Sequence, residues 1–266
     1  MQLLKKMYRN IYLERGAGMN IKKLVVSAVV LSSFTVTGIS AGVCAERTVP
    51  YPAGTKIAGA ASVQGSEIDH KDSIYYTHPD FYTMKGNENR LLLHNYPTYQ
   101  QTTECTCGPA AAITVLYYYG DKSQDENTLA KAMKTQPYPI GSNPADMVAG
   151  LKSLGWKVDS SLETKPFDSY DAFASFVQEK LRADTPVLVE NVEWGGHWRV
   201  IIGYDTMGTA SSLDDTLIFA DPYDTSDHLQ DGYTIGNGER FFSMWFDHSM
   251  LPETQRNQPW IVIYRK

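Results

Sequence analysis

The hydrophobic pattern between residues 107 and 182 is that of helices separated by polar loops. An almost wholly apolar run follows Pro109, which suits the first position of a helix, and stops at Gly120, which suits the left-handed residue after one. Apolar residues recur at helical spacing further along the chain. The pattern predicts helices over residues 109–119, 124–133, 144–154 and 169–182, the third of them capped by Asn143, begun by Pro144 and ended by Gly155.

After Asp184 the pattern changes to short apolar or alternating runs separated by turn residues, which is typical of strands. Helices followed by antiparallel strands indicate an α+β architecture in two lobes or layers. The strands are expected over residues 186–192, 197–204, 216–221, 240–246 and 260–264.

Residues 46–89 show no helical period and are rich in Gly, Ser, Pro and Tyr. Short strands are expected over residues 73–76 and 80–84, followed by a turn at Gly86-Asn87 and a strand over residues 90–96. We therefore expect an N-terminal appendage, residues 46–89, that packs on a main domain formed by residues 90–266.

Residues 1–45 have the pattern of an export signal. Two lysines precede an apolar run over residues 24–34, and residues 43–45 occupy the positions that a signal peptidase recognises. The apolar run is too short for a membrane span. We expect a signal peptide that starts at Met19 and is cleaved before Glu46, so that the mature protein is secreted or lies in the periplasm or cell envelope.

A lipoprotein would use Cys44 as its lipidated residue, but Val43 is a poor fit at a position where a small residue is expected. Residues 1–18 precede a complete signal peptide, and we interpret them as a misassigned extension.

Charge and cysteine content restrict which partners the mature protein can have and what can stabilise its fold. Removal of residues 1–45 takes away six basic residues and one acidic residue, which changes the formal net charge from −6 to −11. Nucleic acid and anionic lipid repel such a chain, so we expect neither as a partner. Only Cys105 and Cys107 then remain, and their spacing would give a strained, easily reduced bridge at best. A hydrophobic core, not a disulfide framework, must therefore stabilise the fold.

Cys107 stands where a loop enters the first predicted helix. The residues Gly108-Pro109 follow it, and the positive end of a helix dipole favours a thiolate over a thiol. The alternative is that Cys107 is an ordinary small buried residue beside a turn. The choice depends on residues much further along the chain.

His197 begins a predicted strand directly after two glycines, a position where a ligand can approach the backbone closely. Asp221 ends the next strand, and a hairpin brings the start of one strand beside the end of the other. A thiol that attacks an amide needs a base, and the base needs an acceptor on its other ring nitrogen. Cys107, His197 and Asp221 suit these roles, and Gln101 suits that of an oxyanion donor beside the Cys107 N–H.

Each role has competitors. Gln100 rather than Gln101 could face the site, although spacing favours Gln101. Trp194 and Trp198 could be core residues or walls of a substrate cleft. A zinc site formed by Cys105, Cys107, His197 and Asp221 is disfavoured, because the cysteines are one residue apart and Gln101 would have no role. The candidates for the third member of the triad besides Asp221 are Asp205, Asp224 and Asn191.

The chain resembles the bacteriocin-processing (double-glycine leader) cysteine peptidases and their stand-alone bacterial relatives, in the papain-like clan. The resemblance covers the chain from Leu91 onward and implies a papain-like fold, with Gln101 as oxyanion donor, Cys107 as nucleophile, His197 as base and Asp221 as the acceptor that orients it. It rests on Gln101, residues 106–110, Gly196-His197-Trp198, Gly203-Tyr204-Asp205 and Asp221-Pro222.

The best-known members of that family are cytoplasmic domains of exporters, whereas this chain has a predicted export signal, so leader processing is not carried over. We expect an exported cysteine hydrolase that cleaves a peptide or other amide bond through a thioester and needs no cofactor or metal. Its partner would be a peptide or protein substrate. The alternatives are an acyl transferase of the phytochelatin-synthase-like or transglutaminase-like kind, or a non-catalytic peptide-binding module. Oxidation of Cys105 and Cys107 to a bridge could silence the enzyme.

Overall fold

Seven strands form one antiparallel sheet in the part of the chain that the computed structural model describes, residues 48–63, 79–225 and 229–266. Six of them follow the order β2-β7-β3-β4-β5-β6. The seventh, β1, pairs with the end of β4. The strands are β1 (Arg90–Leu92), β2 (Lys157–Ser160), β3 (Val187–Asn191), β4 (His197–Asp205), β5 (Thr216–Ala220), β6 (Tyr233–Asn237) and β7 (Trp260–Tyr264).

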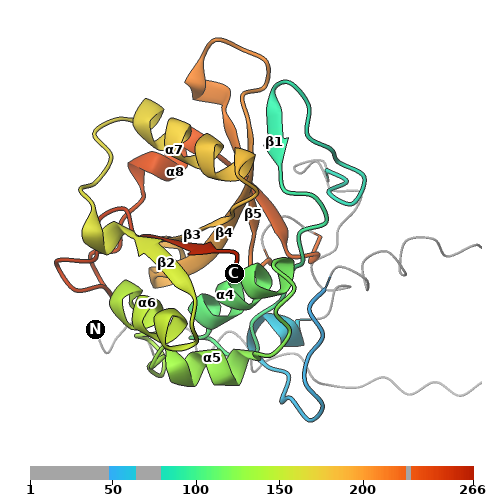
Figure 1. Ribbon diagram of the computed structural model, residues 1–266, viewed down its shortest axis with the longest axis vertical. Coiled ribbons are helices and arrows are strands. Elements are labelled where there is room, and N and C mark those ends of the chain that lie inside the picture. The colour runs from blue at the N-terminus through green and yellow to red at the C-terminus, as the bar shows by residue number, and fades with distance from the viewer. Residues whose placement is uncertain (1–47, 64–78, 226–228) are drawn as a thin grey trace, which may run out of the picture. The chain divides into compact units, whose positions relative to one another are not determined.

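Helices cover both faces of this sheet (Figure 1). Helices α4, α5 and α6 lie on one side, and α7 and α8 lie on the other. The bounds are α4 (Cys107–Tyr118), α5 (Glu126–Ala132), α6 (Pro144–Ser153), α7 (Tyr170–Arg182) and α8 (Gly238–Ser243), with short 3-10 turns η1 (Gly59–Ser62), η2 (Ser161–Glu163), η3 (Glu193–Gly195) and η4 (Ser212–Asp214). The expected α+β class is thus confirmed, with helix α4 and the sheet packed as layers.

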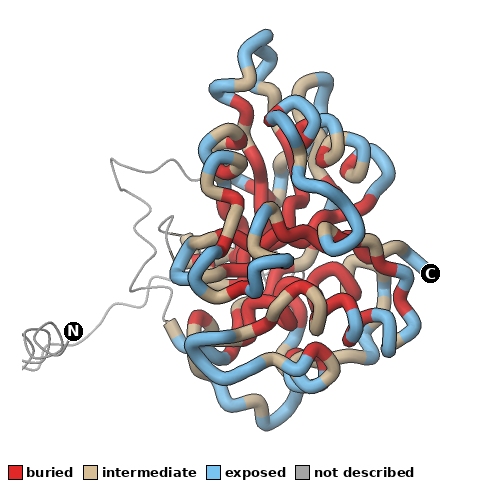
Figure 2. The backbone as a smooth tube through the Cα atoms, turned by 90° about the vertical axis from the view of Figure 1, so that its left-hand side faces the viewer, coloured by how far each residue is buried: buried red, intermediate tan, exposed pale blue. Residues whose placement is uncertain are grey.

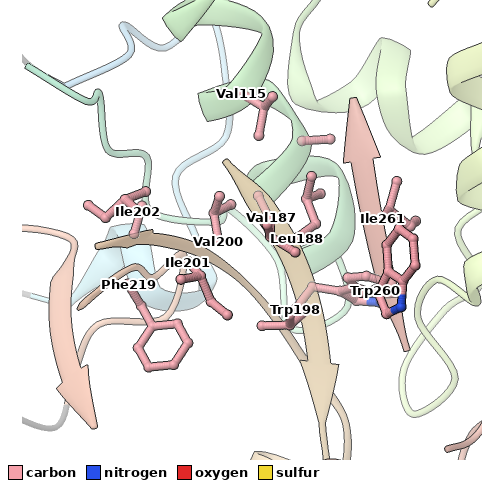
Figure 3. Close-up of a cluster of buried hydrophobic side chains, with 14 of the residues drawn as sticks. Val115, Val187, Leu188, Trp198, Val200, Ile201, Ile202, Phe219, Trp260 and Ile261 are labelled. Carbon is pink, nitrogen blue, oxygen red and sulfur yellow. The ribbon is translucent and has the colours of Figure 1, made fainter. Parts of the chain in front are cut away.

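Successive side chains of β4 point to opposite faces of the sheet and so contribute to the core on both sides (Figure 3). Val200 points toward Val115 of α4, whereas Ile201 points away from α4, beside Phe219 of β5. Phe219 contacts the ring of Phe241 in α8, with ring centroids 5.5 Å apart. The buried stretches of backbone accordingly run through the middle of the described region, and the exposed ones lie outside (Figure 2). Burial of both faces explains why the strand sequences are apolar runs.

The helix boundaries follow the sequence signals closely. The side chain of Asn143 accepts a hydrogen bond from the Asp146 N–H and caps α6, with Pro144 at its first position. Gly120 and Gly155 have φ of +86° and +81°, as expected for residues that end helices. One detail differs: α4 begins at Cys107, so that Pro109 is its third residue and not its first.

Two predicted strands are wrong. Residues 80–84 form a turn, in which the Asp80 carboxylate accepts bonds from the N–H groups of Tyr82 and Thr83. The stretch over residues 240–246 contains helix α8, because the side chain of Asn237 accepts a bond from the Arg240 N–H and so caps a helix there. Aromatic residues are frequent in strands, and this misled the pattern. The short strands β2 and β6 were not predicted.

The predicted signal peptide, residues 1–45, and the predicted strand over residues 73–76 lie outside the described residues. All described residues belong to one unit, Gly38–Lys266. Within it, Val49 and Phe81 from the expected appendage are buried in the common core. No helix in the described ranges is long and apolar enough to cross a membrane.

Candidate active site

Cys107 is the first residue of α4 and is buried. Its neighbour along the helix, Gly108, fits closely: a Cβ there would lie 2.9 Å from the Met147 sulfur and 3.0 Å from the Ser142 Cβ. The start of α4 is therefore packed tightly against the segment that leads into α6. The helix N-terminus places partial positive charge at the Cys107 backbone.

A buried carboxylate, Glu126, fixes the loop that precedes Cys107. Its Oε1 accepts hydrogen bonds from the Thr102 N–H at 3.0 Å and from the Thr106 hydroxyl at 2.5 Å. Its Oε2 accepts from the hydroxyls of Tyr99 at 2.8 Å and Thr102 at 2.7 Å. Four donors from one loop thus compensate the burial of this carboxylate. No local pattern in the sequence points to Glu126, because its partners lie 20 to 27 residues earlier in the chain.

His197 and Asp221 are in direct contact. The Nε2 atom of His197 lies 2.7 Å from the Asp221 Oδ1, and both side chains are buried. A carboxylate can only accept, so Nε2 carries the proton in this bond. The pairing of β4 with β5 brings the two residues together, as the hairpin argument predicts, with Val200 opposite Ala220. The second ring nitrogen, Nδ1, is left for Cys107, which interacts with the His197 side chain.

The pKa values of this pair are shifted in opposite directions. Burial lowers the pKa of His197, but the charge and hydrogen bond of Asp221 and the interaction with Cys107 outweigh it and raise the value to about 9. Burial raises the pKa of Asp221, but His197 and then Arg199, with the Tyr223 N–H, outweigh it and lower the value to about 2. The imidazolium–carboxylate pair is therefore the favoured state near neutral pH.

Arg199 supports Asp221 from the same face of β4 as His197. Its Nη1 lies 3.8 Å from the Asp221 Oδ2, and the guanidinium stacks on the ring of Phe219 at 4.2 Å. The other nitrogen, Nη2, forms an ion pair with Glu193. Arg199 lies two residues after His197, and alternate residues of a strand share a face. This spacing is the signal in the sequence that places Arg199 beside His197.

Gln101 is buried beside the end of β5, and its backbone N–H donates to the Pro222 carbonyl at 2.8 Å. Its side-chain Nε2 donates to the Thr103 carbonyl at 2.7 Å. The neighbouring Gln100 instead donates from Nε2 to the Asp221 carbonyl at 3.2 Å. Both glutamines therefore tie the loop before α4 to the strand end that carries Asp221.

The other candidates for the third residue have other partners. The Asp205 carboxylate forms an ion pair with Arg90, and the Asp224 carboxylate accepts from the Gly232 N–H. Asn191 lies opposite His197 in the register of β3 and β4, but its Oδ1 faces the Arg199 guanidinium at 3.5 Å. Only Asp221 is hydrogen-bonded to His197 among these described residues.

The two tryptophans beside His197 have different environments. Trp198 is buried and donates from Nε1 to the Ser142 carbonyl, so it is a core residue, although its ring also lines a pocket. Trp194 is 69% exposed and has φ of +56° in the turn η3. Its ring lies 5.9 Å from that of Tyr223, which in turn lies 6.5 Å from the His197 ring. Trp194 and Tyr223 thus form an aromatic wall over the histidine.

A pocket of about 350 Å³, including its open mouth, reaches Cys107. Two buried acids from distant parts of the chain line it, Glu190 of β3 and Asp247 after α8. Cys105 lines it as well, and both cysteines are free thiols. In the described ranges, no three His, Cys, Asp or Glu side chains are grouped so that they could hold a metal ion.

Comparisons with known proteins identify the family of the chain. Residues 93–245, more than half of the chain, match the Peptidase_C39 like family. No curated protein matches the chain. Among solved structures, a putative C39-like peptidase from Bacillus anthracis is 15% identical, with a TM-score of 0.47, and the match covers 67% of this chain and 99% of that one.

A second solved structure is the peptidase domain of Streptococcus ComA, described as a bifunctional ABC transporter involved in a quorum-sensing pathway. It is 20% identical, with a TM-score of 0.42, over 64% of this chain and 96% of that one. The match to the family spans the cysteine helix and the His197 and Asp221 strands. The chain therefore belongs to the C39-like peptidase family and has the α+β, papain-like fold expected for it.

Proposed function

We propose that the protein is an exported cysteine hydrolase that cleaves a peptide bond, or another amide bond, through a thioester acyl-enzyme. In this proposal Cys107 is the nucleophile, His197 the base and Asp221 the group that orients it. The observation that carries the proposal is the buried hydrogen bond between His197 and Asp221, with the other ring nitrogen left for a cysteine at the start of a helix.

The reaction would begin from the state in which His197 carries the proton and Cys107 is a thiolate. The thiolate attacks the carbonyl carbon of the substrate, and the C–N bond breaks as the imidazolium returns that proton to the leaving amine. A thioester with Cys107 remains. Water then attacks the thioester while His197 accepts its proton, and the carboxylic acid product leaves. The Asp221 bond to Nε2 holds the ring in the tautomer that both steps require.

The negative oxygen of the tetrahedral intermediate needs donors. The backbone N–H of Cys107 is one candidate, because the first N–H groups of a helix have no partner within it. Gln101 is the second. Its amide has two N–H groups, of which the bond to the Thr103 carbonyl uses one, so one remains for the oxyanion.

The test compares turnover of a peptide library by the wild type, by Cys107→Ala and by His197→Ala. Both variants should lose all measurable turnover, whereas Glu163→Gln, a change at an exposed surface acid, should behave as the wild type. Mass spectrometry should detect a Cys107 acyl-enzyme. Full activity of Cys107→Ala would refute the proposal, and turnover products joined to added amines or thiols instead of water would replace hydrolysis by acyl transfer.

Export is a separate part of the proposal and rests on the apolar run over residues 24–34 and the basic residues before it. N-terminal sequencing of the protein from the culture medium and from cell fractions tests it. A mature chain that begins at or near Glu46 is expected. Retention of the uncleaved chain inside the cell would contradict it.

A further inference from the structure

Two buried carboxyl groups, those of Glu190 and Asp247, meet in the pocket beside Cys107. Glu190 is 2% exposed and Asp247 is fully buried. In the described ranges neither oxygen of Glu190, nor Oδ2 of Asp247, has a hydrogen-bond donor from elsewhere in the protein. Buried carboxylates without donors or a counter-ion are costly. Such a pair therefore needs an explanation beyond folding.

Asp247 is held in a fixed orientation. Its Oδ1 accepts hydrogen bonds from the Ser249 N–H at 2.8 Å, the Ser249 hydroxyl at 2.7 Å and the Met250 N–H at 3.0 Å. The other oxygen, Oδ2, is thereby turned toward Gly196 and Glu190. A Cβ on Gly196 would lie only 2.6 Å from the Asp247 Oδ2 and 3.3 Å from the Glu190 Oε1. The glycine before His197 thus packs directly against both carboxyl groups, beside the catalytic residues.

The two acids and Cys107 interact electrostatically. Burial, then the charge of Asp247 and the contact with it, and finally the charge of Cys107 raise the pKa of Glu190 well above its usual value. The raised pKa favours a proton on Glu190, in its contact with Asp247. A bound cation would take the place of that proton and supply the missing donors.

The chemistry of the lining favours an ammonium group. The described residues provide no third ligand that would complete a metal site. A primary ammonium is compact and has three donors, which matches the three orphaned carboxyl oxygens. We propose that Glu190 and Asp247 form a specificity subsite that binds a substrate ammonium group, from a lysine side chain or a free amino terminus, next to the bond that is cleaved. The inference rests on the proposed function for its biological meaning, but the subsite can be tested without turnover.

The first experiment measures how fast thiol reagents of different charge modify Cys107, in a Cys105→Ser background. Aminoethyl methanethiosulfonate carries an ammonium, whereas methyl methanethiosulfonate is neutral. The ratio of their rates should be about ten or more in the otherwise unsubstituted protein and should fall at least several-fold in Glu190→Gln, which keeps the shape of the side chain. The matched control Glu104→Gln removes an acid at the edge of the same pocket and should leave most of the ratio.

The subsite would be refuted by an equal rate for both reagents, or by a rate ratio in Glu190→Gln that equals that of the unsubstituted protein. Glu190 and Asp247 would then be a structural contact between a protonated and an ionised acid. Failure of the proposed function would give a different result. Cys107 would then react no faster than Cys105 does in Cys107→Ser, and His197→Ala would leave the rate of Cys107 modification unchanged. A circular dichroism melt of each variant excludes unfolding as the cause.

The second experiment identifies the source of the ammonium. N-acetylated peptides that carry lysine or norleucine at each of several positions are compared with norleucine peptides that have a free amino terminus. A preference for lysine in at least one position identifies a side-chain subsite, and a preference for the free terminus identifies an aminopeptidase-like subsite. Either preference should drop at least about ten-fold in Glu190→Gln. Efficient cleavage with neither preference would overturn the proposal.

Discussion

The Nε2 atom of His197 donates to the Oδ1 atom of Asp221 over 2.7 Å, and the pair is shielded from solvent. Shielding makes the interaction between the two charges strong, because water does not screen it. Arg199 adds a third charge at 3.8 Å from the other carboxylate oxygen. The position of the pair at the meeting point of β4 and β5 allows its protonation to be tested through both activity and stability.

Activity should decline at alkaline pH as His197 loses its proton, with a midpoint near its pKa of about 9. In Asp221→Ala, burial still lowers the pKa of His197 but the carboxylate no longer raises it, so the decline should move to lower pH. The rate constant kcat/KM should also fall roughly 10²-fold or more. The measurement is kcat/KM against pH. Asp205→Asn, at an aspartate that pairs with Arg90, serves as control, and an unmoved alkaline limb in Asp221→Ala would contradict the assignment.

The stability of the fold should depend on pH through His197 and Asp221, and the two pKa shifts fix the direction of this dependence. The raised pKa of His197 contributes stability that is complete below 6.5 and disappears as the pH rises through about 9. The lowered pKa of Asp221 contributes stability that is complete above 3.8 and disappears as the pH falls through about 2. The pair therefore stabilises the fold most between these limits, at pH 4 to 6.5.

Urea unfolding at pH 6.5 and at pH 9 measures the first of these losses. The free energy of unfolding of the wild type should fall by roughly 1–3 kcal/mol over this interval. His197→Gln lacks the titrating group and should show a clearly smaller fall. An equal fall in both proteins would mean that other groups dominate the pH dependence.

Glu126→Ala should destabilise the protein by about 2 kcal/mol or more, because the buried donors of Tyr99, Thr102 and Thr106 lose their acceptor. Glu126→Gln keeps one acceptor oxygen and should cost less. Urea unfolding measures the difference. Both variants should also slow Cys107 alkylation under native conditions, because Thr106 directly precedes Cys107. A loss of stability with unchanged Cys107 reactivity would show that the network supports the fold alone.

The local signals in the sequence predicted the helices and the ends of the central strands well. Gly120, Asn143 and Gly155 act through the backbone next to them, so their effect follows from sequence alone. The contact of His197 with Asp221 also follows from local connectivity, since the two residues stand on neighbouring strands of a hairpin. The matching family confirms the papain-like fold that the motifs implied.

The features that were missed depend on contacts between distant segments. Glu190 and Asp247 come from β3 and from the loop after α8, and nothing in either local pattern shows that they meet. The helix α8 has an aromatic sequence typical of a strand, but its rings pack against Phe173 of α7, and an N-cap starts it as a helix. Tertiary packing outweighed local propensity at these places.

Oxidation should join Cys105 and Cys107 and stop the reaction. Both thiols are free, and a bridge across one intervening residue would distort the start of α4, so it should be strained and easily reduced. Diamide should remove two hydrogen atoms from the peptide that contains both cysteines and abolish turnover, and dithiothreitol should reverse both effects. The loss of hydrogen should be absent in Cys105→Ser. Turnover that is indifferent to diamide would contradict the prediction.

Gly196→Ala should damage both the fold and the site. The residue has φ of +118°, which a residue with a side chain rarely adopts, and its added Cβ would lie 2.6 Å from the Asp247 Oδ2. Asp247 cannot move away cheaply, because three donors hold its other oxygen. We expect the free energy of unfolding, measured with urea, to fall by about 2 kcal/mol or more.

Gly195→Ala is the matched control, since Gly195 also has a positive φ, but a Cβ added there would meet no atom within 4 Å. An equal loss in both variants would mean that backbone strain alone is responsible, whereas a larger loss in Gly196→Ala would show that contact with the acid pair adds to it.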